Sequence, residues 1–385
     1  MSPFRFLLPF VASSVATLLA FGESGCSKSD TEPGSDGGAD GDGQVSVDGG
    51  GSEVSTTDPC AKDNGEGAPE LLECTGLFAS TTDRALGPRV RAYTPGVTFW
   101  SDGAEKFRWV ALPEGTTIDA TLADEWQFPE GTKFWKEFRV GGKKVETRFM
   151  WKNDPKRWTF AVYRWNDAET SAVSIPYGER NVNGTTYEIA ATAQCEDCHG
   201  GRRDRVLGFE EFALGLSTAK GVTMKMLVDE NLVSPKPPTT SWSLPEDATG
   251  KAAPALAFLH MNCGTSCHNE NGRANASFTK LYMKLRAEAV RAGDAGVNDA
   301  GIGVLDVRAT DVWTTALGAT IQMKGYETSD WKRITAGDPD KSLVVHLAEH
   351  RGDNGAADQM PPVGTHQPDV AGVAALKAWI AALPK

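Results

Sequence analysis

Long hydrophobic runs and positive charge are both scarce in this chain. After an N-terminal apolar stretch that ends at Phe21, no segment of the 385 residues approaches the length needed to cross a bilayer. Lysine and arginine number 39 against 51 acidic residues, which gives a formal net charge of −12. That balance argues against a nucleic-acid partner, because nucleic acids attract proteins with a positive surface. The length predicts two or three domains.

Aromatic side chains are absent from residues 27–58. This segment holds eight acidic residues and a single lysine, Lys28, in a background of glycine and serine. Such a composition cannot bury enough apolar surface to fold. We therefore expect a flexible, disordered tether at residues 26–58.

The apolar run before this tether is typical of an export signal. It covers residues 6–21 and is too short to cross a membrane stably. Cys26 then stands where a bacterial lipid-anchor cysteine is expected, which predicts a signal peptide at residues 1–25 and a lipid on Cys26. The alternative is ordinary cleavage near Gly22, which leaves the cysteine free. In either case the protein is expected outside the cytoplasm, and with the lipid it is a periplasmic or cell-surface lipoprotein of the outer membrane.

Cysteine is also scarce, and the seven cysteines divide into one, two and four. Cys195, Cys198 and His199 form C-E-D-C-H, the C-x-x-C-H signature of covalent c-type haem attachment. Two such thiols add to the vinyl groups at one edge of a haem, and the histidine binds the iron as proximal ligand. The alternatives are a thioredoxin-like redox pair and half of a zinc site. A redox pair does not need His199, and a zinc site would need a second Cys/His pair nearby.

A second set, Cys263, Cys267 and His268, forms C-G-T-S-C-H with one extra residue between the cysteines. A local disulfide in a Gly/Ser loop is the alternative. Met360 lies further along the chain and precedes two prolines, which forbid a helix and leave a loop able to bring a thioether to an iron. We therefore predict a second haem c with His268 and Met360 as its axial ligands.

The stretch from Phe258 to the C-terminus resembles a class I cytochrome c. The resemblance rests on the second cysteine–histidine set, the segment at residues 334–339, Met360 with its prolines, and a predicted helix after Asp369. It covers about a third of the chain and implies a helical fold around a haem. The C-x3-C spacing departs from that family's pattern.

Cys60 and Cys74 remain after these assignments. They flank a loop-like stretch at residues 66–69, near the start of the part expected to fold. Because the compartment is expected to be oxidising, we predict that these two cysteines form a disulfide.

Residues 59–190 are predicted to form an antiparallel β domain. Apolar and polar residues alternate over 145–151, and Gly141-Gly142 before them is a strong two-residue hairpin signal. A further strand is expected at residues 158–165. Sixteen of the 33 aromatic residues fall within 93–165, where they fill a sandwich core or, alternatively, form a platform for a flat ligand.

Residues 90–385 resemble a family of exported bacterial haem lipoproteins. The resemblance is carried by F-W-S-D-G-A-E-K at 99–106, F-P-E-G-T at 128–132, and E-T-R at 146–148 ahead of a C-x-x-C-H motif. Members of that family place an aromatic β domain before cytochrome c motifs. The match implies an architecture and haem binding rather than a pathway.

Charged residues near the first motif have two interpretations each. Glu146 and Arg148 lie two apart on one strand face, so they pair with charges on neighbouring strands, or Arg148 binds a haem propionate or the adjacent cytochrome domain. The basic cluster at residues 200–205 neutralises propionates of the first haem or forms a solvated loop.

The sixth ligand of the first iron is open at this stage. Met224, Met226 and His260 are candidates, against the simpler reading that the methionines fill a core. His346 and His350 lie four apart on a predicted helix and share one face, which makes a metal site conceivable but leaves it without a third ligand.

The expected fold class is α+β. An antiparallel β-sandwich-like domain at 59–190 is followed by a first haem-binding segment and linker at 191–250, and then by a mainly helical cytochrome c-like domain at 251–385 that holds the second haem. The function predicted is electron transfer between redox partner proteins. The alternatives are a di-haem peroxidase or oxidase that acts at the first haem, and a ligand-binding β domain coupled to a cytochrome.

Overall fold

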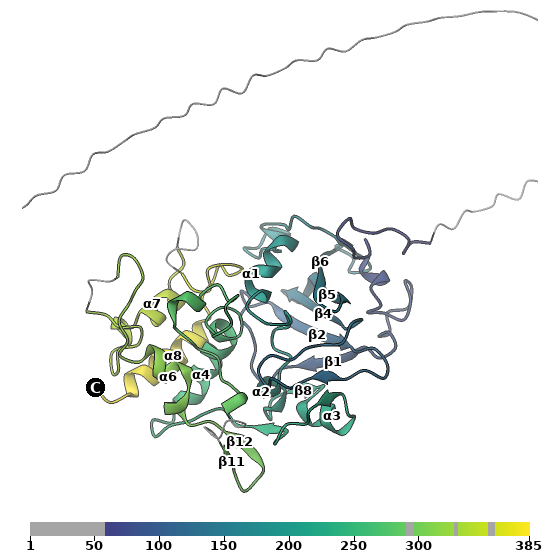
Figure 1. Ribbon diagram of the computed structural model, residues 1–385. Helices are drawn as coiled ribbons and strands as arrows, with labels where there is room; N and C mark the ends of the chain where they lie inside the picture. The colour runs from purple at the N-terminus through teal and green to yellow at the C-terminus, as the bar shows by residue number, and fades with distance from the viewer. Residues whose placement is uncertain (1–57, 290–295, 327–329, 353–358) are drawn as a thin grey trace, which may run out of the picture. The chain divides into compact units, whose positions relative to one another are not determined.

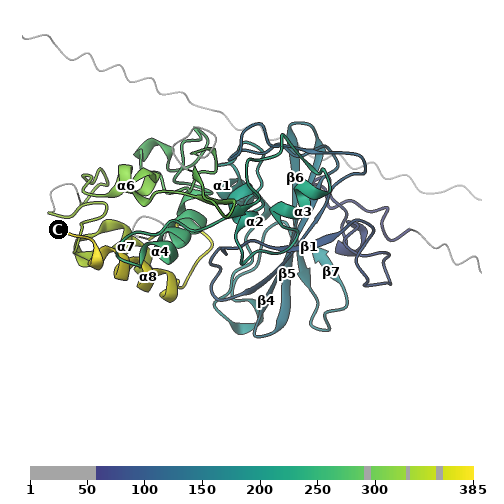
Figure 2. The same ribbon diagram turned by 90° about the horizontal axis from the view of Figure 1, so that it is seen from below.

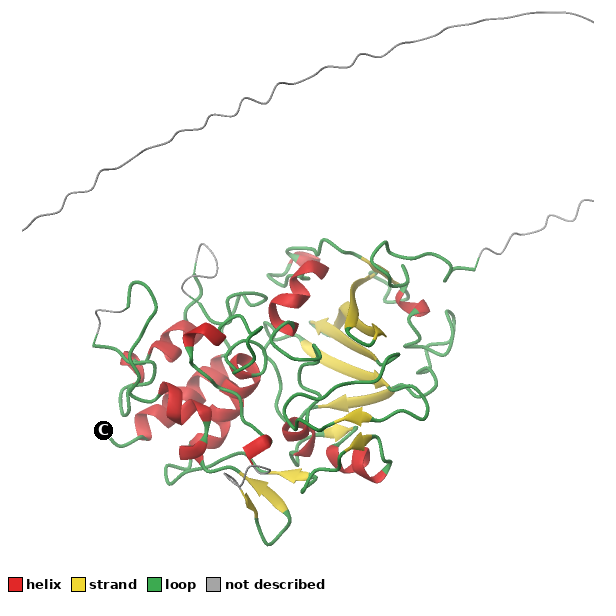
Figure 3. Ribbon diagram, in the orientation of Figure 1, coloured by secondary structure: helices red, strands yellow, loops and turns green. Residues whose placement is uncertain are grey.

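A large antiparallel sheet and several helices make up the described chain, so the α+β class predicted from the sequence is confirmed (Figures 1 and 3). The computed structural model describes residues 58–385 except 290–295, 327–329 and 353–358. The predicted signal peptide, most of the tether and Cys26 lie outside the described residues. Within the described ranges, no helix is long and apolar enough to cross a bilayer.

The main sheet has the strand order β7-β6-β5-β4-β2-β1-β8. Its strands are β1 (Arg91–Thr94), β2 (Glu105–Ala111), β4 (Lys133–Val140), β5 (Lys143–Asp154), β6 (Arg157–Trp165), β7 (Ala172–Ser174) and β8 (Lys220–Gly221). The two smaller sheets are formed by β3 (Ile118–Asp119) with β9 (Val233–Ser234), and by β10 (Ser241–Trp242), β12 (Ile302–Val304) and β11 (Gly296–Val297).

The predicted hairpin at Gly141-Gly142 is present between β4 and β5. Both glycines have positive φ values, 59° and 81°, which are the conformations that a two-residue hairpin turn requires. Just before this turn, the register between β4 and β5 shifts between Phe138 and Arg139. Because of this shift, Val145 packs with Phe138 rather than on the face of Phe149, so the strict alternation expected over 145–151 is wrong at its first residue.

The expected sandwich of two packed sheets is instead one sheet covered by different segments. On one face Trp135, Phe149 and Tyr163 pack against Leu72 and Leu77 from the N-terminal segment. The opposite face carries a second cluster, in which Phe134 and Trp158 meet residues 206–233. The long aromatic strands are therefore buried on both sides by chain that is not part of a large second sheet.

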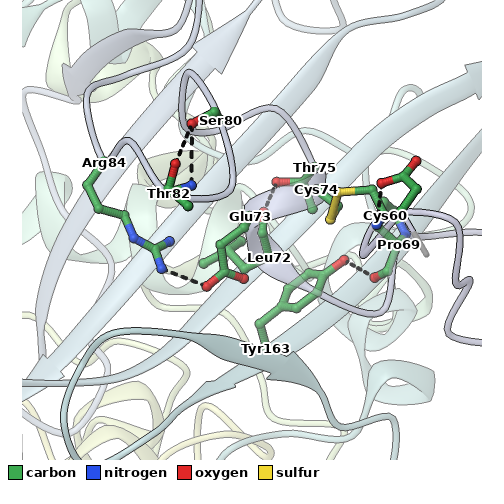
Figure 4. The surroundings of a disulfide bond; sticks show 11 residues. Cys60, Pro69, Leu72, Glu73, Cys74, Thr75, Ser80, Thr82, Arg84 and Tyr163 are labelled. Atoms are coloured by element: carbon green, nitrogen blue, oxygen red, sulfur yellow. Dashed lines mark hydrogen bonds and ion pairs between the residues drawn. A yellow bond between two sulfur atoms is a disulfide. The ribbon is translucent and has the colours of Figure 1, made fainter. Parts of the chain in front are cut away.

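Cys60 and Cys74, which the sequence singles out as a pair, are joined by a disulfide with a Cα–Cα distance of 5.3 Å (Figure 4). The bridge secures the segment that covers the far face of the sheet. Tyr163 Oη donates to the carbonyl of Pro69 at 2.7 Å, and Trp135 Nε1 donates to Thr75 Oγ1 at 2.8 Å.

The helices are short except for the last one. They are α1 (Cys195–His199), α2 (Glu211–Gly215), α3 (Met224–Asp229), α4 (Ala252–Leu259), α6 (Asp311–Ala316), α7 (Leu343–Glu349) and α8 (Val370–Ala382). Single turns are η1 (Leu72–Cys74), η2 (Val182–Gly184), η3 (Thr192–Gln194), η4 (His260–Gly264), η5 (Ser277–Thr279), η6 (Val307–Ala309) and η7 (Pro339–Lys341).

The helix predicted after Asp369 is present as α8. Asp369 caps it by accepting from the backbone N–H of Gly372 at 3.0 Å. Its Leu376 and Trp379 are fully buried and belong to the same apolar cluster as Leu256 of α4. Figures 1 and 2 show α4, α7 and α8 close together, away from the sheet.

Residues 191–250 connect the two regions by strand pairing. β8 joins the edge of the main sheet next to β1, whereas β10 pairs with β12 among the helices. Residues 56–385 form one compact unit. The first cysteine–histidine set thus lies at the point where the sheet and the helices meet.

Candidate haem-binding site

The first cysteine–histidine set forms the short helix α1. Cys195 and Cys198 are three residues apart and so lie on one helix face, half-buried and outside any disulfide. His199 Nδ1 forms a hydrogen bond with the backbone carbonyl of Arg205. Because a carbonyl can only accept, the proton is on Nδ1, and Nε2 keeps the lone pair that a metal binds.

His268 of the second set is held in the same way. Its Nδ1 lies 3.2 Å from the carbonyl oxygen of Leu281, and Cys263 and Cys267 are also free thiols, so the alternative of a local disulfide is not formed. Burial lowers the pKa of both His199 and His268 to about 4. Each imidazole is therefore neutral near pH 7, which is the form that binds a metal.

The two sets touch each other. Gly201, just after α1, comes so close to the second set that a Cβ on it would lie 1.6 Å from the carbonyl oxygen of Ser266. Asn275 Nδ2 also donates to the backbone carbonyl of Asp197 at 2.8 Å. Only glycine allows this approach, so the sequence that follows the first histidine places the two sets side by side.

The free thiols are not activated. Burial raises the pKa of Cys195 to about 11 and that of Cys263 and Cys267 to about 12. A thioredoxin-like pair needs a lowered thiol pKa, so the redox-pair alternative is disfavoured. In the described ranges no group of three or more His, Cys, Asp or Glu side chains is placed to hold a metal ion, which leaves the zinc alternative without support.

A cavity of about 190 Å³, partly open to solvent, lies between the sheet and α1. Cys195, Cys198 and His199 line one wall. The His199 ring lies 5.3 Å from the Phe160 ring of β6, measured between centroids. Other aromatic residues that line the cavity are Tyr93, Phe99, Trp100, Phe134, Phe138 and Tyr187. An aromatic lining suits a flat, mostly apolar ligand.

Three cations stand side by side on the cavity face of the sheet. Arg108 of β2, Lys136 of β4 and Arg148 of β5 are direct cross-strand partners, and all three line the cavity. We call them the cation row. Like charges opposite one another destabilise a sheet, so the row needs negative charge nearby.

Within the described part of the chain, one member of the cation row has an anionic partner and two do not. Arg148 donates to both carboxylate oxygens of Glu146, at 2.8 and 2.9 Å, and Glu146 also accepts from Tyr187 Oη at 2.7 Å. The expectation that Glu146 and Arg148 pair with neighbouring strands is therefore wrong, because they pair with each other. Among the described residues no carboxylate forms an ion pair with Arg108 or Lys136, and burial lowers the pKa of Lys136 well below its usual range.

Unpaired buried donors show that the cavity fits an anionic cofactor. Arg108 is only 5% exposed, yet its Nη2 has no hydrogen-bond partner among the described residues. Ser101 Oγ, also on the cavity wall, is unpartnered in the same sense. Buried polar groups rarely stay unsatisfied, so an acceptor is missing here. A haem supplies two propionates, and free thiols with a metal-ready histidine stand on the same cavity, so the residues fit haem.

The loop after Met360 closes one side of this cavity. Residues 363–366 line it, and Asp102 anchors the loop by accepting from the backbone N–H groups of His366 at 2.7 Å and Gln367 at 3.1 Å. His366 Nε2 lies 2.9 Å from Glu188 Oε2. An imidazole with a carboxylate partner thus shares the cavity with the first cysteine–histidine set.

Met360 itself packs elsewhere. Its backbone N–H donates to the carbonyl of Leu347 at 2.8 Å, and its half-buried side chain joins a cluster with Met323 and Trp331. Cys263 packs against a different cluster. The structure therefore does not bring Met360 together with the second set by any contact, and its ligation of the second iron stays a prediction.

The candidates for the sixth ligand of the first iron do not line the cavity. Met224 is fully buried in the apolar cluster under the sheet, and Met226 is partly exposed on the same helix. His260 Nδ1 accepts from the N–H of Leu285 at 3.0 Å, whereas its buried Nε2 lies 3.1 Å from Glu210 Oε1 without forming a hydrogen bond. His260 is thus a core residue.

The basic cluster at 200–205 does not line the cavity, and two of its arginines form ion pairs rather than a simple solvated loop. Arg202 is buried and pairs with Glu210 at 2.6 Å, and Arg205 pairs with Glu196 at 3.0 Å. These pairs fix the turn after α1, including the carbonyl that orients His199.

His346 and His350 do lie together, with parallel rings whose centroids are 5.6 Å apart. His350 follows the end of α7 rather than sharing the predicted helix. His346 Nε2 lies 3.1 Å from Tyr326 Oη, which gives it an ordinary polar partner in place of a metal.

Sequence reasoning missed Arg108, Lys136 and His366. Alternation along β2 and β4 could place the two cations on one face, but only the register between the strands makes them neighbours of Arg148. His366 had one available signal, its position six residues after Met360 in a chain with only six histidines.

A comparison of the chain with protein-family models, curated proteins and solved structures finds no match. The resemblances to class I cytochromes c and to exported haem lipoproteins therefore rest on the motifs alone.

Proposed function

We propose that the protein is a di-haem c-type cytochrome that transfers electrons between redox partner proteins outside the cytoplasm. The observation that carries the proposal is an arrangement that occurs twice: two free thiols followed by a histidine whose Nδ1 bonds a backbone carbonyl. Each copy offers what covalent haem attachment needs, namely two thiols on one side and an oriented imidazole.

The residues have distinct roles in this proposal. Cys195 and Cys198 hold the first haem and His199 binds its iron, while the second set, with Met360 as sixth ligand, does the same for the second haem in a cytochrome c-like helical region. A bound haem supplies one-electron chemistry through its ferric and ferrous states. The chain's own contribution is placement: the contact between Gly201 and Ser266 keeps the two attachment segments adjacent, which favours electron exchange between them.

Intact-mass measurement of protein matured in a host that attaches haem c tests this proposal. The expected mass corresponds to the chain plus two haems. Cys195→Ser with Cys198→Ser should remove one haem, and Cys263→Ser with Cys267→Ser should remove the other. Cys60→Ser with Cys74→Ser is the matched control and should retain both. Wild-type protein without attached haem would refute the proposal.

Attachment to a membrane is a separate part of the proposal. A lipid on Cys26 would tether the folded unit through residues 27–55. Cell fractionation should recover the wild-type protein with membranes and Cys26→Ser protein in the soluble extracytoplasmic fraction. Equal partition of the two proteins would remove the lipid anchor from this account.

The cavity favours one second candidate, a peroxide-reducing enzyme at the first haem. His366 and Glu188 lie 2.9 Å apart on its wall, and a histidine–carboxylate pair can move protons at a bound substrate. Peroxide turnover that falls in His366→Ala, with haem content unchanged, would support this candidate over a pure carrier.

A further inference from the structure

We propose that Arg108 and Lys136 form a carboxylate-binding site, and that its occupant is the propionate edge of the haem attached at Cys195 and Cys198. The inference rests on the proposed function, since it names how the first haem is recognised. It assigns a role to two residues that no sequence motif marks.

Charge and burial require an anion at this place. Arg108 lines the cavity and is 95% buried, its buried Nη2 has no hydrogen-bond partner, and it has no carboxylate partner among the described residues. Lys136 lies opposite it in the register, with its ammonium over the rings of Phe99 and Phe138. A buried cation without a counter-ion is strongly disfavoured, so an anionic ligand stabilises the folded sheet.

Arg148 is not part of this site. Its guanidinium is already bound at two points by Glu146, and Tyr187 Oη donates to the same carboxylate. A carboxylate ligand therefore gains most at the other two members of the cation row.

The direction of the row matches the direction of a haem. Arg148 lies near enough to both thiols of α1 to interact with them electrostatically. From there the row leads across β4 to β2, and since neighbouring strands lie about 4.8 Å apart, Arg108 is about 10 Å further on. A haem carries its propionates at the edge opposite the vinyl groups that the cysteines use. Attachment at one end of the row thus sends the propionates toward the other end.

Aromatic residues fill the distance between the two ends. Phe134 and Phe138 flank Lys136 on the cavity face of β4, and Trp100 and Phe99 line the cavity from the loop before β2. Aromatic rings along the row, with the unpaired Arg108 at the end away from the thiols, suit an amphipathic macrocycle.

Redox titration of the full-length, haem-loaded protein tests the site. Arg108→Gln should lower one of the two midpoint potentials by about 59 mV. For one electron this corresponds to a tenfold change in the equilibrium constant for reduction. The other potential should not move. Loss of a cation beside the haem and exposure of an unpaired propionate both disfavour the added electron. Arg108→Lys keeps the charge and should restore most of the potential.

Arg91→Gln is the control. Arg91 lies on the neighbouring strand β1, pairs with Glu230 at 2.6 Å, and is outside the cavity lining. It should leave both potentials unchanged. An Arg108→Gln protein whose two potentials equal those of the wild type would overturn the assignment.

A second experiment separates this inference from the proposed function. The full chain with Cys195→Ala, Cys198→Ala, Cys263→Ala and Cys267→Ala cannot form thioethers at either set, and its affinities for iron protoporphyrin IX and for the dimethyl ester of the same compound can be measured. The acid should bind at least tenfold more tightly, and the preference should vanish when Arg108→Gln and Lys136→Gln are added. This result would hold for the site even if mass spectrometry found no covalent haem on the native chain.

Acetate distinguishes a free anion from a propionate. If acetate binds the same chain and loses its affinity in the Arg108→Gln/Lys136→Gln protein, while acid and ester bind equally, the occupant is a small anion and the propionate assignment fails. No binding of acetate together with a preference for the acid supports it.

Discussion

A histidine is ready to bind a metal when its other ring nitrogen has a fixed partner. In this chain the partner is the backbone in both sets: the carbonyl of Arg205 for His199, and that of Leu281 for His268. The carbonyl that holds the histidine lies six residues after His199 in one set and 13 residues after His268 in the other. Two unrelated local structures therefore produce the same orientation, which is why we assign both histidines the same role.

Met360 can be tested against a neighbour of the same type. Met360→Ala should abolish a sulfur-to-iron charge-transfer band and lower the potential of the second haem, because Met/His ligation raises that potential. Met323→Ala is the matched control, since Met323 is half-buried in the same cluster and should change neither property. If the band survives Met360→Ala and is lost in Met323→Ala, Met323 is the ligand.

The sequence was informative where covalent chemistry fixes spacing. Cys195, Cys198 and His199 can be found from the sequence because the predicted attachment at two thiols and one imidazole fixes three of five consecutive residues. Arg108 and His366 could not be found in this way, because they reach the cavity through the register of β2 and through a loop more than 150 residues away. Residues that act through tertiary placement leave no local pattern.

Secondary-structure elements also differ in whether a local sequence pattern or tertiary pairing defines them. The hairpin at Gly141-Gly142 was predictable because two positive φ values need two glycines. The edge strand β8 was not, because Lys220–Gly221 has neither length nor alternation and exists only by pairing with β1. The coverage of the sheet by residues 58–90 was hidden for a similar reason, since the segment has no periodic pattern of its own.

The turn after α1 provides a prediction at this scale. A side chain at Gly201 would meet the Ser266 carbonyl, so Gly201→Ala should push the two attachment segments apart and lower the free energy of unfolding by about 1–3 kcal/mol. Electron exchange between the two haems should also slow, measured by flash photoreduction.

Gly272→Ala is the control for this change, since a Cβ there meets no atom within 4 Å. Its effect on stability should stay within about 0.5 kcal/mol. Equal stability and equal electron exchange in the two variants would contradict the assigned contact.

The disulfide between Cys60 and Cys74 should matter for stability and not for haem. It closes a loop with a sequence separation of 14, for which the chain-entropy estimate is about 3 kcal/mol. Urea unfolding of Cys60→Ser/Cys74→Ser protein should show a loss near that size. Haem content and both potentials should equal those of the wild type, because the bridge lies on the face of the sheet opposite the cavity. A loss of haem would show that the two faces are coupled.

At the scale of the whole molecule, the two faces of the main sheet have different surroundings. Its far face is closed by the N-terminal segment, whereas its near face meets α1 and the loop at 363–366 around a cavity. Because residues 56–385 form one compact unit, the strands that carry the cation row also fix the distance between the first attachment segment and the C-terminal loop. If a haem is attached at Cys195 and Cys198, the β region is part of its site. Aromatic residues fill a core on both faces of the sheet, and some of those on the near face also line the cavity.

Carrier and enzyme differ in whether the first iron is open. In a carrier, a ligand from the chain occupies the sixth position, so carbon monoxide should not shift the spectrum of the ferrous protein and peroxide turnover should be negligible. If Met360 binds the second iron, we expect the second haem to show neither a carbon monoxide shift nor peroxide turnover.

For the first haem the decisive residue is His366, which reaches the cavity with Glu188 beside it. If His366 fills the sixth position, His366→Ala should create a carbon monoxide shift that the wild type lacks. If it serves instead as an acid–base group at an open iron, the wild type should already bind carbon monoxide, and His366→Ala should reduce peroxide turnover without removing that shift. Wild-type protein that binds carbon monoxide and turns over peroxide rapidly, with both properties lost in His199 variants, would replace the carrier by an enzyme whose active site is the first haem.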